Sequence, residues 1–143
     1  MNQDTITKVA ELIKENSAQG QAGFGFCTLS LIDEEGFPTA SVMMPSKSEG
    51  INQITFGTML DENRAKRAAK DNKASVCFAT AAYCINLVGE VEVITADEVK
   101  RDMWYDGLVH HFTGPDDPNY CVLKFNTKRY KFFIDGEDVA GTV

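Results

Sequence analysis

This chain of 143 residues has no long apolar run, and its first residues do not resemble a secretory signal. Its apolar stretches are far shorter than the roughly 20 residues that a membrane-spanning helix needs. The start, Met1-Asn2-Gln3-Asp4, lacks the basic and apolar regions of a secretory signal. We therefore expect no membrane segment and a cytoplasmic location.

Histidine is scarce, and closely spaced cysteines are missing as well. Histidine occurs only as the neighbours His110 and His111, whose side chains would point about 100° apart on a helix and would share a metal ion poorly. The cysteines are widely separated and form no C-x-x-C pair, so we expect reduced, buried thiols and no metal site. They are Cys27, Cys77, Cys84 and Cys121.

Basic residues are fewer than acidic ones. The chain has 14 Lys and Arg and 21 Asp and Glu, which gives a net charge of −7. A polyanion binder needs a broad basic surface, so we expect no nucleic-acid partner. Within this acidic chain, however, five basic residues gather in ten positions. They are Arg64, Lys66, Arg67, Lys70 and Lys73.

The basic cluster follows a strand-like segment that ends near Thr58. A helix dipole favours anions in its first turn, so a cation at Arg64 suggests an anion close by. The free N–H groups of a helix start, the Thr58 hydroxyl and the Arg64 guanidinium could together bind a phosphate. A solvated basic helix face is the alternative, and the residues alone leave both open.

Hydrophobic spacing predicts a mainly β (α+β) fold in a single domain spanning residues 1–143. Helical periodicity covers residues 4–17 and 97–111, and the basic cluster from Arg64 to Lys73 is expected to form a further helix, the basic helix, between the third and fourth strands. A bulge or sharp bend is expected at Gly89. Residues 45–50 and 113–119 are expected to be loops. Alternating or β-rich patterns predict strands over residues 24–32, 37–44, 51–58, 74–80, 84–95, 120–125 and 129–134.

Other patterns have simpler explanations than a site. The glycines 20, 23 and 25 have the wrong spacing and precede a strand, which argues against a dinucleotide fingerprint. Asp116 and Asp117 lie between prolines and are explained by turn chemistry. Trp104 lies on an apolar helix stripe, where it packs or contacts a cofactor. Because no nucleophile or carboxylate pair stands out, any catalysis would depend on a bound cofactor.

In order and spacing, several segments resemble the FMN-binding split barrels of the pyridoxamine 5′-phosphate oxidase superfamily. The similarity is greatest to the general stress protein 26-like branch and covers nearly the whole chain. It is carried by residues 36–44 (GFPTASVMM), residues 56–58 (FGT) followed by Arg64, residues 87–93 (LVGEVEV), residues 103–104 (MW) and residues 112–118 (FTGPDDP).

The resemblance implies a six- to seven-stranded antiparallel split β-barrel with peripheral helices. It also implies a homodimer with an FMN in each of two interface clefts. By position, Arg64 corresponds to the family's phosphate-binding Lys, and Thr58 corresponds to the Thr at the end of the strand before it. Residues 41–46 would line the flavin. The cofactor-binding residues expected on this basis are Ser41, Val42, Met43, Met44, Phe56, Gly57, Thr58, Asn63, Arg64, Arg67 and Trp104.

Two departures from the family pattern concern the phosphate. Ser41 stands where the vitamin B6 oxidases have an Arg, and Glu62-Asn63 replaces their Ser-Arg pair. Lys66 or Arg67 could compensate for the missing cations. The oxidases' C-terminal Arg and His have no match in residues 132–137 (FFIDGE), so we do not expect vitamin B6 oxidation.

Three functions follow from the resemblance. The first is an FMN-dependent oxidoreductase or reductase that acts on an unknown small electron acceptor or substrate. The second is a flavin-binding or flavin-buffering stress protein without turnover. The third is a split barrel that holds haem or a deazaflavin in the same cleft.

Overall fold

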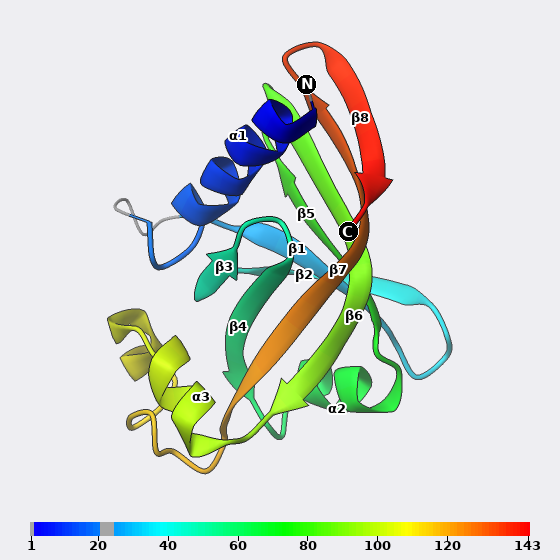
Figure 1. Cartoon of the computed structure of the whole chain (residues 1–143). Helices are drawn as coiled ribbons and strands as arrows, with labels where there is room; N and C mark the ends of the chain where they lie inside the picture. The colour runs from blue at the N-terminus through cyan, green and yellow to red at the C-terminus, as the bar shows by residue number, and fades with distance from the viewer. Residues whose placement is uncertain (1, 21–24) are drawn as a thin grey trace.

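A single coiled antiparallel sheet forms the body of the protein (Figure 1). The computed structural model describes residues 2–20 and 25–143, and within them the sheet has eight strands. The strands are β1 (Cys27–Ile32), β2 (Pro38–Met43), β3 (Lys47–Glu49), β4 (Gln53–Met59), β5 (Lys73–Ala79), β6 (Tyr83–Ile94), β7 (Tyr120–Ile134) and β8 (Glu137–Thr142). Seven of them lie side by side in the order β2-β1-β5-β6-β7-β4-β3, and β8 pairs with β7. The predicted mainly β, split-barrel fold class is confirmed.

The two longest strands, β6 and β7, pair with each other in the middle of the sheet, and their other partners cover only part of each strand. The first half of β7 pairs with β4 and the second half with β8, while β6 pairs with β5 only up to Glu90. The register between β6 and β7 shifts between Val88 and Gly89, which confirms the predicted irregularity. A side chain at Gly89 would collide with the carbonyl oxygen of Asn126, so only glycine allows the strands to approach here.

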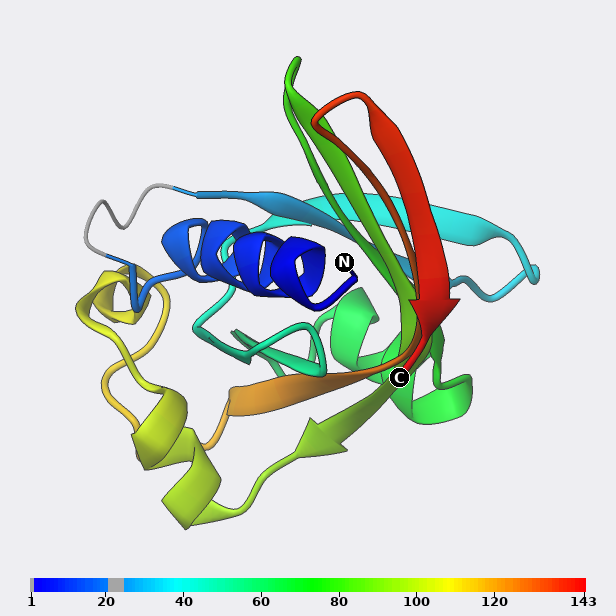
Figure 2. The same ribbon diagram turned by 45° about the horizontal axis from the view of Figure 1, so that its top comes forward.

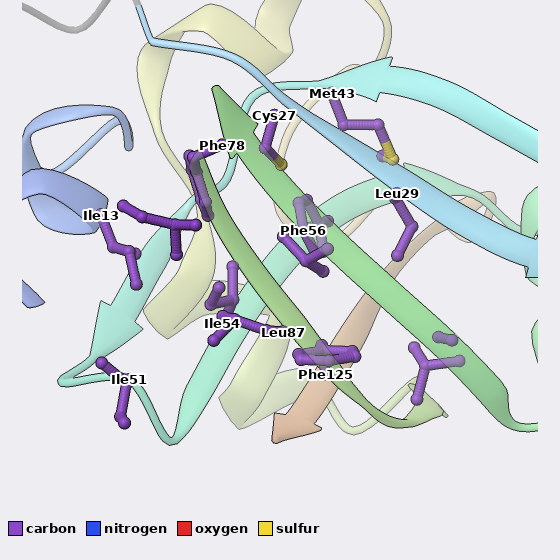
Figure 3. Packing of buried hydrophobic residues seen from close by; sticks show 14 of the residues in the cluster. Ile13, Cys27, Leu29, Met43, Ile51, Ile54, Phe56, Phe78, Leu87 and Phe125 are labelled. Carbon is purple, nitrogen blue, oxygen red and sulfur yellow. The ribbon is translucent and has the colours of Figure 1, made fainter. Parts of the chain in front are cut away.

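The core lies inside the curved sheet (Figure 3). Alternate residues of the strands point into it, and Ile54, Phe56, Leu87 and Phe125 are fully buried. Each large apolar side chain that is buried in this way contributes roughly 1.5–3 kcal/mol to folding. The period-two pattern that predicted the strands therefore also identifies the residues that stabilise the sheet.

Three α-helices pack against the sheet, and α1 lies within its curve (Figures 1 and 2). α1 (Asn2–Glu15) contacts β3 and places Ile13 in the core, α2 (Asn63–Lys70) packs on β1 and β6, and α3 (Asp97–Met103) packs on β4 and β7. The middle of α1 contacts the turn before β8, because Lys8 Nζ lies 2.7 Å from Asp135 Oδ2. None of the described helices is both long and apolar enough to cross a bilayer.

Some predicted element boundaries were wrong. Residues 45–50 are not all loop, since β3 lies there, and β8 was not expected at all, so the sheet gains strands beyond the six or seven predicted. The segments 120–125 and 129–134 form one strand, β7, because the shifted register accommodates the polar residues between them. The predicted start of the first strand, at residue 24, lies outside the described residues.

The predicted helices also differ from those observed. The helix expected over residues 97–111 ends at Met103, because Trp104 takes an extended conformation (ψ 140°), and a 3-10 helix, η1 (Asp106–His110), follows. Lys73 was placed in the basic helix but begins β5. The basic helix α2 therefore ends at Lys70.

Candidate functional site

A groove with a volume of about 260 Å³ opens where β2, β4, the start of α2 and the segment after α3 come together. Its walls differ in character: one end carries polar and charged groups, and both sides are apolar or aromatic. The residues that line it are Phe26, Val42, Met43, Met44, Gly57, Thr58, Met59, Glu62, Arg64, Tyr105, Leu108, His111 and Phe112.

The polar end is formed by Thr58 at the end of β4, Glu62 before α2 and Arg64 in the first turn of α2. The first N–H groups of any α-helix lack intrahelical partners, and Glu62 provides no side-chain cap for those of α2. The Glu62 carboxylate instead lies 2.7 Å from Arg64 Nη2 and accepts a hydrogen bond of 3.5 Å from the Thr58 hydroxyl. A cation, a hydroxyl and a helix start thus meet at one place.

The first side wall comes from β2 and the residue before β1. Val42 and Phe26 are 66% and 60% exposed, which is unusual for apolar side chains, whereas Met43 is buried. Together with Met44 they give the groove an apolar surface next to the polar end. Exposed apolar side chains gathered around a groove are typical of a binding surface.

The second side wall comes from Tyr105, Leu108, His111 and Phe112. None of these residues was predicted at the site, because Tyr105, Leu108 and His111 fall in the segment predicted to be a helix and Phe112 begins the segment that follows it. Burial raises the pKa of the Tyr105 hydroxyl. The side chain therefore stays protonated at neutral pH and is available as a hydrogen-bond donor.

This second wall is held in place by the loop that follows it. The buried Lys100 donates from Nζ to the carbonyl oxygen of Asp117 (3.0 Å), and the Tyr120 hydroxyl donates to the carbonyl oxygen of Lys100 (2.8 Å). The Asp117 carboxylate accepts bonds from the backbone N–H groups of Asn119 and Thr113, which together hold its pKa below its usual range. Asp117 thus has the turn role predicted for it.

The structure brings six of the eleven predicted cofactor residues to the groove: Val42, Met43, Met44, Gly57, Thr58 and Arg64. Phe56 points into the core and is 0% exposed, so its side chain faces away from the groove. Trp104 makes edge contacts with the rings of Phe112 and Tyr120, which is the packing role left open for it. Ser41 and Asn63 lie next to lining residues but do not line the groove themselves.

Arg67, the remaining candidate, faces a different hollow of about 420 Å³ between α2 and the β1–β2 turn. There its guanidinium binds the Glu34 carboxylate, with Nη2 3.1 Å from Oε2. Three basic and three acidic residues line this hollow, so its charges balance and it does not form an anion site. They are Lys66, Arg67 and Lys70, and Asp33, Glu34 and Asp71.

No group of three or more His, Cys, Asp or Glu side chains in residues 2–20 and 25–143 is arranged to hold a metal ion. All four cysteines carry free thiols. The chemistry available at the groove is therefore that of one cation, one carboxylate, a threonine hydroxyl, a tyrosine and an imidazole. These groups can bind and orient an anionic or aromatic ligand.

Fold and groove together define a split-barrel protein with a groove at one end of β4. The model of the pyridoxamine 5′-phosphate oxidase family matches residues 13–133, and the chain belongs to this family. No curated protein matches the chain.

Solved structures agree on the fold. A protein from Clostridium acetobutylicum related to general stress protein 26 of B. subtilis superposes with a TM-score of 0.83 at 22% identity, covering 100% of this chain and 97% of that one. A pyridoxamine 5′-phosphate oxidase-related, FMN binding protein from Nostoc punctiforme gives a TM-score of 0.57 at 13% identity, covering 82% and 86%. A heme binding protein from Mycobacterium smegmatis gives 0.67 at 18% identity, covering 82% and 52%.

Proposed function

We propose that this chain is an FMN-binding protein that uses the flavin to reduce or oxidise a small molecule, and that the groove beside Arg64 holds the cofactor. The observation that carries the proposal is the joining of two surfaces in one groove. A cation and a helix start form one end, and an apolar strand forms the adjoining side. FMN has the same two parts, a phosphate and a large flat ring.

The residues present fit the two parts of FMN. Arg64 and the uncapped N–H groups at the start of α2 would hold the phosphate, with the Thr58 hydroxyl as a further donor. Val42 and Met44 would lie along the ring. When bound, FMN supplies hydride or single-electron transfer, which none of the protein's own groove side chains can perform.

The groove is also small for this ligand. Pockets for small molecules usually measure about 300–1,000 Å³, and the groove of one chain encloses about 260 Å³. We propose that a second copy of the chain supplies the missing wall, so that the protein is a homodimer with two flavin sites. The exposed Phe26 and Val42 at the groove support this arrangement.

The remaining parts of the proposal concern role and location. A small-molecule partner, and not a nucleic acid, fits the net charge of −7, since binding a polyanion needs an excess of basic groups. The four free thiols fit a reducing compartment, and we place the protein in the cytoplasm. Structural neighbours named for general stress protein 26 support a role in a stress response.

A second candidate ligand is haem. His111, an exposed residue, lines the groove beside the apolar Leu108 and Phe112, and histidine is a common axial ligand of haem iron. The neighbour from Mycobacterium smegmatis is a heme binding protein. The Arg64 site is partly neutralised by Glu62, which favours a ligand without a dianionic phosphate.

The visible absorption spectrum of the purified protein separates these ligands, since flavin and haem absorb at different wavelengths. Titration with FMN, followed by flavin fluorescence, is expected to show one FMN per chain. The flavin assignment is wrong if FMN at high micromolar concentration is neither quenched nor retained. Steady-state oxidation of a reduced nicotinamide with an added acceptor then distinguishes an oxidoreductase from a protein that only stores flavin.

A further inference from the structure

We propose that Glu62 acts as a built-in competitor of the ligand's phosphate and so sets how strongly the groove prefers phosphorylated over unphosphorylated ligands. This proposal rests on the proposed function for its flavin part. Its basis is the position of one carboxylate, which lies at the point where the cation, the hydroxyl and the helix start of the groove meet.

The contacts of Glu62 are those that a bound phosphate would make. Its Oε1 lies 2.7 Å from Arg64 Nη2, and its Oε2 accepts from Thr58 Oγ1 at 3.5 Å. Each of the two carboxylate oxygens thus engages a different member of the anion site. Glu62 thereby supplies, from within the chain, the negative charge that the sequence predicted at this position.

A purely structural role does not explain this placement. Glu62 occupies the N-cap of α2, where Ser, Thr, Asp and Asn are preferred because their side chains bond the helix N–H groups. The Glu62 side chain makes no such bond. Its carboxylate is directed to the groove residues and not to the helix backbone.

The Arg64–Glu62 ion pair leaves one hydrogen-bond donor of the Arg64 guanidinium, Nε, without a partner in the described residues. Arg64 Nε is buried and has no hydrogen-bond partner within the described part of the chain. An arginine can offer two parallel donors to a phosphate, whereas the Glu62 carboxylate contacts the guanidinium at Nη2. A phosphate that displaced the carboxylate would therefore gain a donor that the chain itself does not use.

Two consequences follow for ligand choice. An incoming dianionic phosphate must either displace the Glu62 carboxylate or lie beside it, and both cost affinity because like charges repel at short range. A ligand without a phosphate does not meet this cost. The wild-type groove is therefore expected to discriminate weakly between FMN and riboflavin.

The test compares wild type with Glu62→Gln and Glu62→Ala, with Glu11→Gln as control. Glu11 is exposed on α1 and does not line the groove, so its variant removes the same charge elsewhere. We expect both Glu62 variants to bind FMN about tenfold more tightly than wild type and riboflavin with unchanged affinity. The Glu11 variant should bind both ligands with wild-type affinity. Equal tightening for both ligands, or no change for FMN, would overturn the proposal.

A second measurement does not depend on flavin. Inorganic phosphate is titrated against each protein while the backbone amide NMR signals of Asn63 and Arg64 are followed. The Glu62 variants are expected to reach half-saturation at about one tenth of the wild-type phosphate concentration, and equal midpoints contradict the proposal. If phosphate binding tightens but no variant binds FMN, the flavin function fails while the role of Glu62 stands.

Discussion

The guanidinium of Arg67 and the carboxylate of Glu34 form a forked pair that joins α2 to the turn between β1 and β2. Arg67 Nε donates to Oε1 at 3.2 Å, and Nη2 donates to Oε2 at 3.1 Å. The turn itself is shaped by Asp33, whose carboxylate accepts from the N–H groups of Glu35 and Phe37. Arg67 is thus engaged in holding a hairpin and lies outside the groove.

The Arg67–Glu34 pair gives a prediction about stability at acid pH. The hydrogen bond from Arg67 holds the pKa of Glu34 below its ordinary value of about 4.3. A carboxyl whose pKa is lower in the folded state stabilises the fold above that ordinary value, and the stabilisation is lost as the pH falls through the folded-state pKa. Arg67→Ala should therefore lower the thermal midpoint by at most a few degrees near pH 6.

Below about pH 4 the difference between Arg67→Ala and wild type should shrink, because Glu34 becomes protonated in both. Thermal melts followed by circular dichroism from pH 3 to pH 7 measure this. FMN affinity at pH 7 should stay within about twofold of wild type. A difference in melting that is the same at every pH, or a large loss of FMN affinity, would contradict the assigned role of Arg67.

Much of the fold could be predicted because burial leaves a pattern in the sequence. In β1 and β6, buried and less buried residues alternate, and this period of two is readable without coordinates. β3 and β8 leave no such pattern, since three residues are too few and the residues of β8 are mostly exposed. Their pairing depends on β4 and β7, which approach them only in the folded chain.

The groove could be predicted in part for a similar reason. The residues from β2 and β4 were found through short segments that resemble the family, while the wall of Tyr105, Leu108, His111 and Phe112 was missed. That wall depends on the end of α3 at Met103 and on the Lys100–Asp117 contact, neither of which has a local sequence signal. The sequence also could not predict that the Glu62 side chain turns toward Arg64, because this is a side-chain conformation of the folded chain.

Gly89→Ala tests the close approach of β6 and β7. The added methyl group would collide with the backbone of Asn126, which cannot move without disturbing the pairing. We expect the free energy of unfolding in urea to fall by roughly 1–3 kcal/mol. Gly114→Ala is the matched control, because an added carbon there meets nothing within 4 Å, and its effect should stay within about 0.5 kcal/mol.

Arg64→Ala tests the phosphate end of the groove. The lost hydrogen bonds to a charged group are worth roughly 1.5–3 kcal/mol, so FMN should bind about ten- to a hundredfold more weakly. Riboflavin, which has no phosphate, should bind nearly as well as it does to wild type. Fluorescence titrations with both ligands measure the difference.

Lys66→Ala is the control for Arg64→Ala. Lys66 is an exposed residue of the same helix, and it faces the hollow with balanced charges. Its loss should change FMN affinity little. An equal loss of FMN and riboflavin affinity in Arg64→Ala would mean that Arg64 supports the ring site or the fold.

Oxidation of pyridoxamine 5′-phosphate should be absent or marginal. Residues 132–137, at the β7–β8 hairpin, contain neither the Arg nor the His that the oxidases have near their C-terminus; Asp135 lies in the turn and Glu137 begins β8. A direct assay for pyridoxal 5′-phosphate decides this, and turnover near one per second or above, within the ordinary enzyme range, would contradict it.

The final prediction is a homodimer that forms before any flavin binds. Val42 and Phe26 expose most of their apolar surface beside a groove that is small for FMN. Obligate homodimers commonly bury at least about 2,000 Å² in total, or roughly 1,000 Å² for each chain, which is about one eighth of the 7966 Å² that this chain exposes. Light scattering of the flavin-free protein at low micromolar concentration should give twice the 15.8 kDa chain mass.

Val42→Asp should shift this equilibrium toward the monomer and weaken FMN binding together, because the charge would be buried where the two copies meet and where the ring lies. Val143→Asp, which places the same charge at an exposed residue in the last position of the chain, should change neither property. A folded monomeric Val42→Asp protein that still binds one FMN per chain with wild-type affinity would show that one chain suffices for the site. The second copy would then have no part in binding the flavin.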